Sequence, residues 1–259
     1  MATRAKSTEF PDVVIRGADK KLYRRSAMGI FLNEDGFCLC FVPVGIQNKD
    51  FLQTVQGGVA KGETPKEALL REIGEEIGLA PEDVIIVEEI LPVDENGETV
   101  PDTGSGSIND NNEVVDETRK VFRYQSKSWR KESIHGQELY PHLCFLSKRN
   151  INKIRLIPRN PEIRREFFSY KIGKLSSLYA QAPPSKREVL QHIVKATYPV
   201  ARRFLADQRY NADNLGSVVE LEHVVFSPRA QGPKGSGPPH GRGVKRKLHD
   251  DNAPTGAPH

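Results

Sequence analysis

The sequence is short of cysteine, tryptophan and long apolar runs. Its 259 residues include three cysteines, one tryptophan and two methionines. The odd cysteine count and the lack of a CxxC pair argue against a disulfide framework or a zinc site. Cys38, Cys40 and Cys144 stand in strand-like apolar runs. We therefore expect buried, reduced thiols in an intracellular protein, either cytoplasmic or nuclear.

Membrane insertion and secretion are not indicated by the sequence. No apolar run approaches the ~18 residues that a membrane helix needs. The N-terminus has two early basic residues with no apolar segment behind them, which is not the pattern of a secretory signal. We expect no membrane partner.

The net charge of +4 is concentrated at the C-terminal end of the chain. From Ser227 onward there are six Lys/Arg against two Asp, while the remaining chain has 32 basic and 32 acidic residues. The same segment has six Gly and six Pro in 33 residues, so we expect a disordered tail at 227–259. Its short basic cluster at 244–248 predicts a nuclear import signal or a nonspecific nucleic-acid contact; the alternative is solvated low-complexity sequence.

The rest of the chain predicts one domain at 21–208, after an N-terminal arm at 1–20 and before a connecting segment at 209–226. A polar stretch at about 92–117 lacks apolar periodicity and predicts a mobile surface insertion. The expected strands are 27–32 and 37–42, joined by an Asp-Gly turn, then 84–90, 121–124, 139–146 and 166–170. A second long amphipathic helix is expected at 186–205, with a kink at Pro199.

The chain is organised around a glycine-rich turn and a helix, Gly57 to Leu79. Thr64 fits an N-cap, Pro65 the first helical position, and Glu67 closes a capping box. Gly78 is suited to end the helix in a left-handed conformation. The expected helix therefore runs from 65 to 77.

Helical spacing places Glu72, Glu75 and Glu76 on one stripe of this helix, beside an apolar stripe that packs on a sheet. Like charges at three- and four-residue spacing repel each other. A cation would reverse this effect, and several hard oxygen donors suit Mg²⁺ or Mn²⁺. The alternative is a solvated acidic face.

The complete pattern is G-x5-E-x7-R-E-U-x-E-E-x-G-U, where U is apolar, and it begins at Gly57. Seven required identities at ordinary residue usage give a chance match of about 10⁻⁸ per start position. This pattern resembles the box of the Nudix hydrolases. The resemblance covers about 22–205 and implies an α/β (α+β) fold, in which a mixed sheet is sandwiched between helices.

Within that superfamily the chain looks most like RNA pyrophosphohydrolases and asymmetric diadenosine polyphosphate hydrolases. The matching segments are Tyr23-Arg24, Gln56-Gly57-Gly58, Phe122-Arg123-Tyr124 with Gly136-Gln137, Pro161-Glu162, and Ser185-Lys186-Arg187. The chain departs from the family where Leu52 and Val55 replace Trp and Pro, Val42-Pro43-Val44 replaces arginines, and Ser185 replaces Phe.

The resemblance implies a role for each matching residue. The metal ligands would be Gly57, through its carbonyl, with Glu72, Glu75, Glu76 and Glu162. Glu72 would be the general base, with Glu162 as its rival, and Arg71 would orient the glutamates through Glu63 or Glu75. The implied substrate contacts are Arg24, Gln56, Gly58 and Lys186.

Three functions agree with these features. The first is metal-dependent hydrolysis of phosphoanhydride bonds in nucleoside diphosphate-linked substrates, at an RNA 5′ end or in a dinucleoside polyphosphate. The second is hydrolysis of a small nucleotide such as ADP-ribose, NADH or a damaged nucleoside triphosphate. The third is an RNA-binding module that keeps the Nudix fold without its chemistry.

Overall fold

The computed structural model describes residues 14–17, 20–45, 51–93, 107–108, 114–115, 121–126 and 134–216. Most of the expected N-terminal arm, most of the insertion and the whole basic tail lie outside these residues. The chain divides into two units, Met1–Val224 and Val225–His259. All described elements belong to the first unit.

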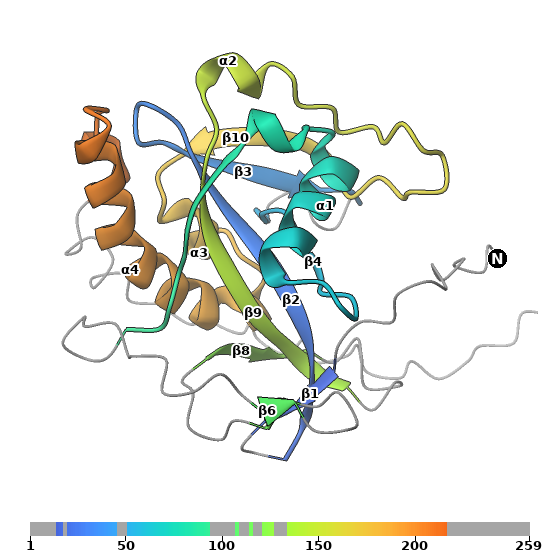
Figure 1. The fold of residues 1–259 in the computed structure, drawn as a ribbon. Coiled ribbons are helices and arrows are strands. Elements are labelled where there is room, and N and C mark those ends of the chain that lie inside the picture. The colour runs from blue at the N-terminus through green and yellow to red at the C-terminus, as the bar shows by residue number, and fades with distance from the viewer. Residues whose placement is uncertain are drawn as a thin grey trace, which may run out of the picture. The chain divides into compact units, whose positions relative to one another are not determined.

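The sheet is built on a long parallel pair, β2 (Leu22–Leu32) and β9 (Ile134–Phe145) (Figure 1). After a register shift between Leu22 and Tyr23, the two strands stay in register up to Leu32 and Phe145. Three antiparallel strands share the other edge of β2, namely β1 (Val14–Arg16), β4 (Gln56–Gly58) and β3 (Cys38–Pro43). The other edge of β9 pairs with β8 (Phe122–Gln125) and β5 (Ile85–Glu89). A further strand, β10 (Phe167–Gly173), extends the sheet beyond β3.

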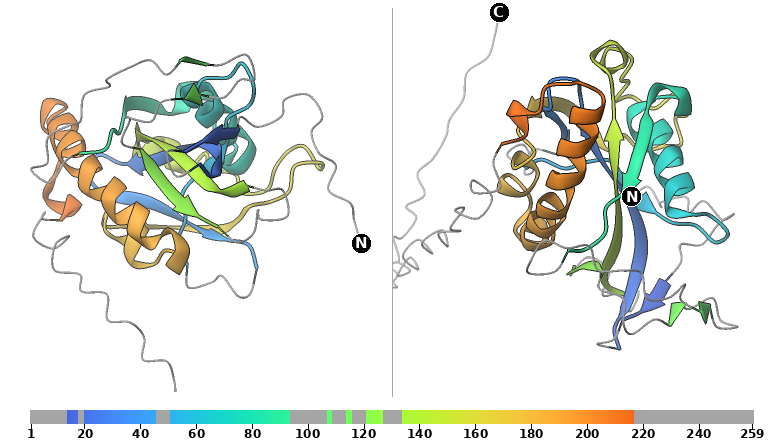
Figure 2. Two further views of the ribbon diagram at one scale, coloured as in Figure 1. Left: turned by 90° about the horizontal axis from the view of Figure 1, so that it is seen from below. Right: turned by 60° about the vertical axis from the view of Figure 1, so that its left-hand side comes forward.

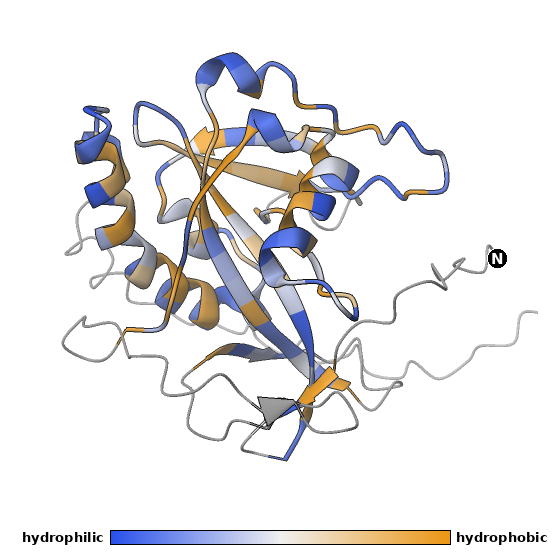
Figure 3. Ribbon diagram, in the orientation of Figure 1, coloured by the Kyte–Doolittle hydropathy of each residue, from blue (hydrophilic) through white to orange (hydrophobic). Residues whose placement is uncertain are grey.

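Helices cover both faces of this sheet. Helix α1 (Pro65–Ile77) lies on one face, and α3 (Ser177–Ala180) with α4 (Pro184–Asp207) lies on the other (Figure 2, right). Side chains along β2 point to the two faces of the sheet and contribute to both core layers. Ala27 and Phe31 pack with α1, while Met28 and Ile30 pack with α4. Figure 3 shows apolar residues on the sides of α1 and α4 that meet the sheet. The expected mixed sheet between helices is confirmed.

The remaining described elements are short. They are the helix α2 (Lys148–Ile151), the 3₁₀ turns η2 (Pro81–Asp83) and η4 (Asp213–Leu215), and the strand pair β6 (Ser107–Ile108) with β7 (Val114–Val115). That strand pair falls inside the stretch where we expected an insertion without regular structure. In the part of the chain that the structure describes, no helix is both long enough and apolar enough to cross a membrane.

Helix α1 has the bounds that its sequence predicts. The hydroxyl of Thr64 accepts from the Glu67 amide, the Glu67 carboxylate accepts from the Thr64 amide, and Gly78 has a φ of 66°. Helix α4 begins two residues earlier and ends two residues later than predicted, and it continues through Pro199. All three cysteines are buried and free, as expected.

Candidate active site

The glycine turn is fixed to the middle of the sheet. Strand β4 pairs with β2, so that Gln56 is opposite Met28 and Gly58 is opposite Ser26. The buried Ser26 hydroxyl donates to the Gly57 carbonyl at 2.8 Å. This anchoring presents the Gly57 peptide to the face of α1 that carries the glutamates.

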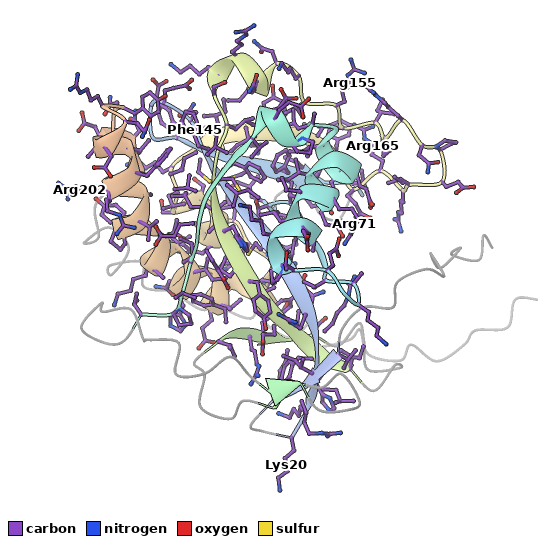
Figure 4. The ribbon with its side chains drawn as sticks, viewed as in Figure 1. Lys20, Arg71, Phe145, Arg155, Arg165 and Arg202 are labelled. Carbon is purple, nitrogen blue, oxygen red and sulfur yellow. The ribbon has the colours of Figure 1, made fainter. Side chains whose placement is uncertain are left out.

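Arg71, labelled in Figure 4, binds the carboxylates to the turn. Its guanidinium donates to both oxygens of Glu63, at 2.9 and 3.1 Å, and to the Gly58 carbonyl at 2.8 Å. It also donates to Glu72 at 2.6 Å and lies 3.6 Å from Glu75. Burial alone would lower the pKa of Arg71, but its bonds to Glu63 and Glu72 raise it, so this arginine stays charged.

Glu72 packs directly against Gly57. A Cβ atom added to Gly57 would lie 1.8 Å from the carboxyl carbon of Glu72, so only glycine leaves room for this side chain. Burial raises the pKa of Glu72, and the neighbouring charge of Arg71 opposes that rise. The Arg24 charge acts in the same direction as Arg71, which places Arg24 near this carboxylate.

The pKa of Glu76 is raised more strongly than that of Glu72. One of the Glu76 carboxylate oxygens accepts from the backbone N–H of Gln56 at 3.3 Å. Burial raises its pKa well above the ordinary value, and the negative charges of Glu72 and Glu166 raise it further. A carboxylate from outside the helix therefore faces this cluster, and it is that of Glu166.

Glu162, which the resemblance assigned to this role, lies in an exposed turn where its amide donates to the Asn160 side chain. Glu166 stands four residues later, directly before β10, and its carbonyl accepts from the Val44 amide at 2.9 Å. The sequence analysis did not single out Glu166 as a site residue. Its approach to Glu76 depends on the pairing of β10 with β3, for which the sequence carries no local signal.

Comparison with known proteins agrees with this geometry. Residues 22–137 match the family model described as the NUDIX domain. The match covers 116 of the 259 residues. An RNA pyrophosphohydrolase of Coxiella burnetii is 42% identical over 78 residues, which cover 30% of this chain and 32% of that protein. One from Francisella tularensis is 41% identical over 69 residues, covering 27% and 43%. The matched segment thus spans less than half the length of these relatives.

Two solved structures resemble the fold at low identity. A dihydroneopterin triphosphate pyrophosphohydrolase of E. coli has a TM-score of 0.39 at 14% identity, covering 66% of this chain and 94% of its own. A C. elegans Ap4A hydrolase complex has a TM-score of 0.39 at 14% identity, covering 69% and 98%.

A polar network extends the glutamate cluster toward α4. The Lys186 ammonium donates to the Gln56 side chain at 3.1 Å and lies 5.3 Å from the centre of the Tyr124 ring. The side-chain amide nitrogen of Gln56 donates to the Ser26 hydroxyl and to the side-chain oxygen of Gln137. That same Gln137 oxygen accepts from the Tyr124 hydroxyl at 2.7 Å. Five elements, β2, β4, β8, β9 and α4, therefore meet beside Glu76.

Burial changes the ionisation of two groups in this network. It lowers the pKa of Lys186 from its usual 10.5 to about 8, although the charge of Glu76 opposes this shift. It also raises the pKa of Tyr124 to about 12. Lys186 therefore remains a cation at neutral pH, and Tyr124 remains a neutral donor. Sequence reasoning quoted Tyr124 and Gln137 only as matches to the family and gave them no role at the site.

The glutamates are engaged by protein groups in this arrangement. Among the described residues, no three His, Cys, Asp or Glu side chains form a set arranged to hold a metal ion. Arg71 binds Glu72, and the Gln56 amide binds Glu76. A metal ion at this cluster is therefore a proposal.

Proposed function

We propose that the chain is a divalent-metal-dependent pyrophosphohydrolase acting on phosphoanhydride bonds of nucleoside diphosphate-linked substrates. Mg²⁺ or Mn²⁺ would be held by Glu72, Glu75, Glu76 and the Gly57 carbonyl. The observation that carries the proposal is the contact of Glu72 with Gly57, which places a carboxylate of α1 against the glycine turn beside two further glutamates.

The donors fit such an ion in kind and in charge. They are hard oxygen atoms, which Mg²⁺ and Mn²⁺ prefer. Burial and neighbouring negative charges raise the pKa values of Glu72 and Glu76, so the ionised carboxylates are disfavoured here and a cation beside them would favour ionisation. A bound divalent cation would neutralise the phosphates and acidify a water molecule.

Arg71 and Glu72 would have different roles in the reaction. Arg71 holds Glu72 and Glu63 in fixed positions and is a positioning residue. Glu72 is our choice of general base, because its raised pKa makes it a better proton acceptor than an ordinary carboxylate. The exposed turn that contains Glu162 gives it a weaker claim.

Positive charge close to Glu72 and Glu76 suits the phosphates of the substrate. Lys186 and Arg24 approach the cluster from α4 and β2, and Gln56 and Gly58 contribute polar groups from the turn. Phosphoryl transfer is catalysed mainly by positioning and by neutralisation of charge, which this arrangement of cations and carboxylates supplies.

The preferred substrate that we propose is a 5′-triphosphorylated RNA end or a dinucleoside polyphosphate. The support is the partial similarity to proteins named RNA pyrophosphohydrolase. A small nucleotide is the second candidate, and a specific observation favours it. Leu52 and Val55, which stand where the family has Trp and Pro, are buried in the core and present no surface to a base.

The test is hydrolysis by the purified full-length chain with Mg²⁺ or Mn²⁺. The panel contains triphosphorylated RNA, diadenosine tetraphosphate, ADP-ribose, NADH and an oxidised nucleoside triphosphate, and kcat/KM is compared across it. A large preference for RNA ends removes the small-nucleotide alternative. Absence of turnover on every phosphoanhydride refutes the proposal and leaves the RNA-binding module.

An RNA-binding module without chemistry predicts a different pattern. RNA affinity would then fall steeply with salt through the basic tail, and Glu76→Gln would leave binding unchanged. Hydrolysis that Glu76→Gln abolishes excludes this third function. A tail contact that only adds RNA affinity to an active hydrolase appears as a salt-dependent KM.

A further inference from the structure

A strong excess of positive charge lies in residues 148–166. This basic segment consists of α2 and the loop that leads from it to β10, and it carries seven Lys/Arg against two Glu. Without it, the chain before Ser227 has 25 basic and 30 acidic residues. The basic segment therefore supplies positive charge to a part of the chain that would otherwise be acidic.

Most of the basic side chains in this segment lack a carboxylate partner. Lys148 pairs with Asp35 at 2.6 Å and Lys153 with Asp83 at 2.5 Å, while Arg165 donates to backbone carbonyls. The other four are exposed and form no ion pair with any residue that the structure describes: Arg149, Arg155, Arg159 and Arg164. Like charges repel, and guanidinium groups match the geometry of phosphates, so arginines left without carboxylates favour a phosphorylated ligand.

The basic segment lies beside the glutamate cluster of α1. The backbone N–H of Arg155 donates to the carbonyl of the last residue of α1 at 2.9 Å. The segment ends at Glu166, whose charge acts on Glu76. Figure 1 shows the loop leaving α2, passing α1 and returning to β10, and in Figure 4 Arg155 and Arg165 lie on the same side of the molecule as Arg71. A polyanion bound at the glutamates would therefore continue onto the basic segment.

An exposed aromatic ring follows the arginines. Phe168 is 63% exposed, although large apolar side chains are usually buried. The Arg165 guanidinium lies 5.6 Å from the centre of this ring, and it donates to the carbonyls of Phe167 and Phe168. Single-stranded nucleic acids are bound by basic side chains that follow the backbone and by aromatic rings on which bases stack. Arginines beside an exposed ring therefore favour a nucleic-acid strand over a small phosphorylated ligand.

We infer that the basic segment binds single-stranded RNA, with its four unpaired arginines on the phosphates and Phe168 under a base. The inference rests on the proposed function, because it extends the same substrate from the glutamate cluster onto a second surface. The nucleotides bound here are those that follow the hydrolysed 5′ end. Within the proposed substrate class, this favours an RNA end over a dinucleoside polyphosphate, which has no chain of further nucleotides.

Fluorescence anisotropy with a short single-stranded RNA that has a 5′ hydroxyl tests the phosphate contacts. The full chain is titrated in the presence of chelator, so neither hydrolysis nor a metal ion is needed. Each phosphate contact on a single strand contributes about 0.7 to the slope of log K against log salt. Arg159→Gln combined with Arg164→Gln should therefore lower the slope by about 1.4 and the affinity at least about tenfold at a salt concentration of about 0.1 M.

The matched control is Arg202→Gln combined with Arg209→Gln. Both residues are exposed, at and just beyond the C-terminal end of α4, and the change removes the same charge from the chain. The basic tail is intact in both double variants, so its contribution to RNA binding is the same in each. We expect the control to bind RNA with nearly the affinity and salt dependence of the parent.

Two substitutions at Phe168 test the stacked base. Loss of one stacked base corresponds to about a five- to 150-fold loss of affinity. Phe168→Leu keeps an apolar side chain without a ring and should weaken binding by about fivefold or more, whereas Phe168→Trp should retain it. Duplex RNA of the same length keeps its bases paired inside the helix and should bind more weakly than the single strand.

Several results would overturn this inference. Equal losses of affinity in the two double variants would show that net charge, and not the basic segment, determines binding. Parent-like binding by Phe168→Leu, or equal affinity for duplex and single strand, would exclude the stacked base. Binding to vesicles that contain phosphatidylserine, without binding to RNA, would assign the segment to a membrane surface. None of these measurements needs turnover, so intact RNA binding in a chain that hydrolyses no phosphoanhydride would refute the proposed function alone.

Discussion

Replacement of Glu76 by glutamine separates a metal-binding role from a structural one. Glutamine keeps the shape of the side chain, and its oxygen can still accept from the Gln56 amide. The substitution removes a negative charge that burial and the charges of Glu72 and Glu166 disfavour. Without metal, we therefore expect the variant to melt at or above the temperature of the parent.

The size of this gain follows from the repulsion on the helix. Glu72 and Glu76 are four residues apart, and a like-charge pair at that spacing destabilises a helix by about 0.2–0.5 kcal/mol. In a domain of this size that corresponds to a rise in Tm of about 1 °C. Because the folded-state pKa of Glu76 is raised, the parent loses this stability as the pH rises from the ordinary glutamate range through the raised value. The two proteins should therefore converge in acid and differ at neutral pH.

With added metal, the parent should melt at a higher temperature than Glu76→Gln. A ligand at 100 times its dissociation constant stabilises the folded state by about 2.7 kcal/mol, which corresponds to roughly 5–10 °C here. We expect the parent to gain this with Mg²⁺ or Mn²⁺ and Glu76→Gln to gain little, as measured by calorimetry with and without a chelator. The exposed Glu82→Gln serves as the control and should behave as the parent does.

One outcome would refute the reasoning outright. If Glu76→Gln melts well below the parent in the presence of chelator, the carboxylate is structural, and the assignment of the site has to be withdrawn. An equal response of both proteins to metal would place the ion elsewhere.

Three further predictions concern the same domain. Lys186→Met should raise the free energy of unfolding at pH 7 by about 1–2 kcal/mol, because burial of the charge costs at most about 3 kcal/mol and loss of the bond to Gln56 costs about 1 kcal/mol. This gain should vanish as the pH rises from about 8 through 10.5, and denaturant titrations at several pH values measure it. Gly57→Ala should displace the Glu72 side chain and lower kcat by orders of magnitude in a turnover assay. Arg123→Ala should destabilise the fold by about 3–5 kcal/mol in urea unfolding, because it leaves a carboxylate that is 3% exposed without its ion pair.

Each of these has a contradicting outcome. A Lys186→Met variant that is less stable than the parent at pH 7 would show that the ammonium is well compensated. Unchanged turnover in Gly57→Ala would mean that Glu72 does not need its present position. A loss of less than about 1 kcal/mol in Arg123→Ala would show that the Glu138 carboxylate is hydrated or protonated instead.

Local signals in the sequence were sufficient for α1. Its cap, its proline at the first position and its terminal glycine each act within a few residues, so the helix starts and ends where they predict. The motif spacing then placed Arg71 and the glutamates relative to Gly57. These contacts depend on a short turn and one helix, and little of the remaining chain is needed to form them.

The long parallel pair was less accessible to sequence reasoning. The expected strand began at residue 27, whereas β2 begins at Leu22, because Arg24, Arg25 and Ser26 interrupt the apolar pattern. They remain in the strand because β9 binds their backbone on one side. Side chains in this stretch reach the site, and so the polar residues that obscured the strand belong to the functional face.

The polar network around Gln56 depends on contacts between residues that are far apart in the sequence. Gln56 bonds to Gln137 and Lys186, which are 81 and 130 positions away in the chain. Periodicity carries no information about such pairs, and only resemblance to a family pointed to Lys186. Glu166 was missed for the same reason, since its approach to Glu76 is set by the pairing of β10 with β3.

The charges of the assembled site explain why Arg71 would be needed in addition to the proposed metal ion. The charge of Glu75 acts on Glu72, and the charges of Glu72, Glu166 and Glu75 act on Glu76. Arg71 donates to Glu63 and Glu72 from a single guanidinium and lies 3.6 Å from Glu75, so it balances part of this charge. Removing Arg71 would therefore weaken the fold and the proposed metal site together, whereas Glu76→Gln removes a ligand of that proposed site without weakening the fold. That difference makes glutamine at position 76 the more informative substitution.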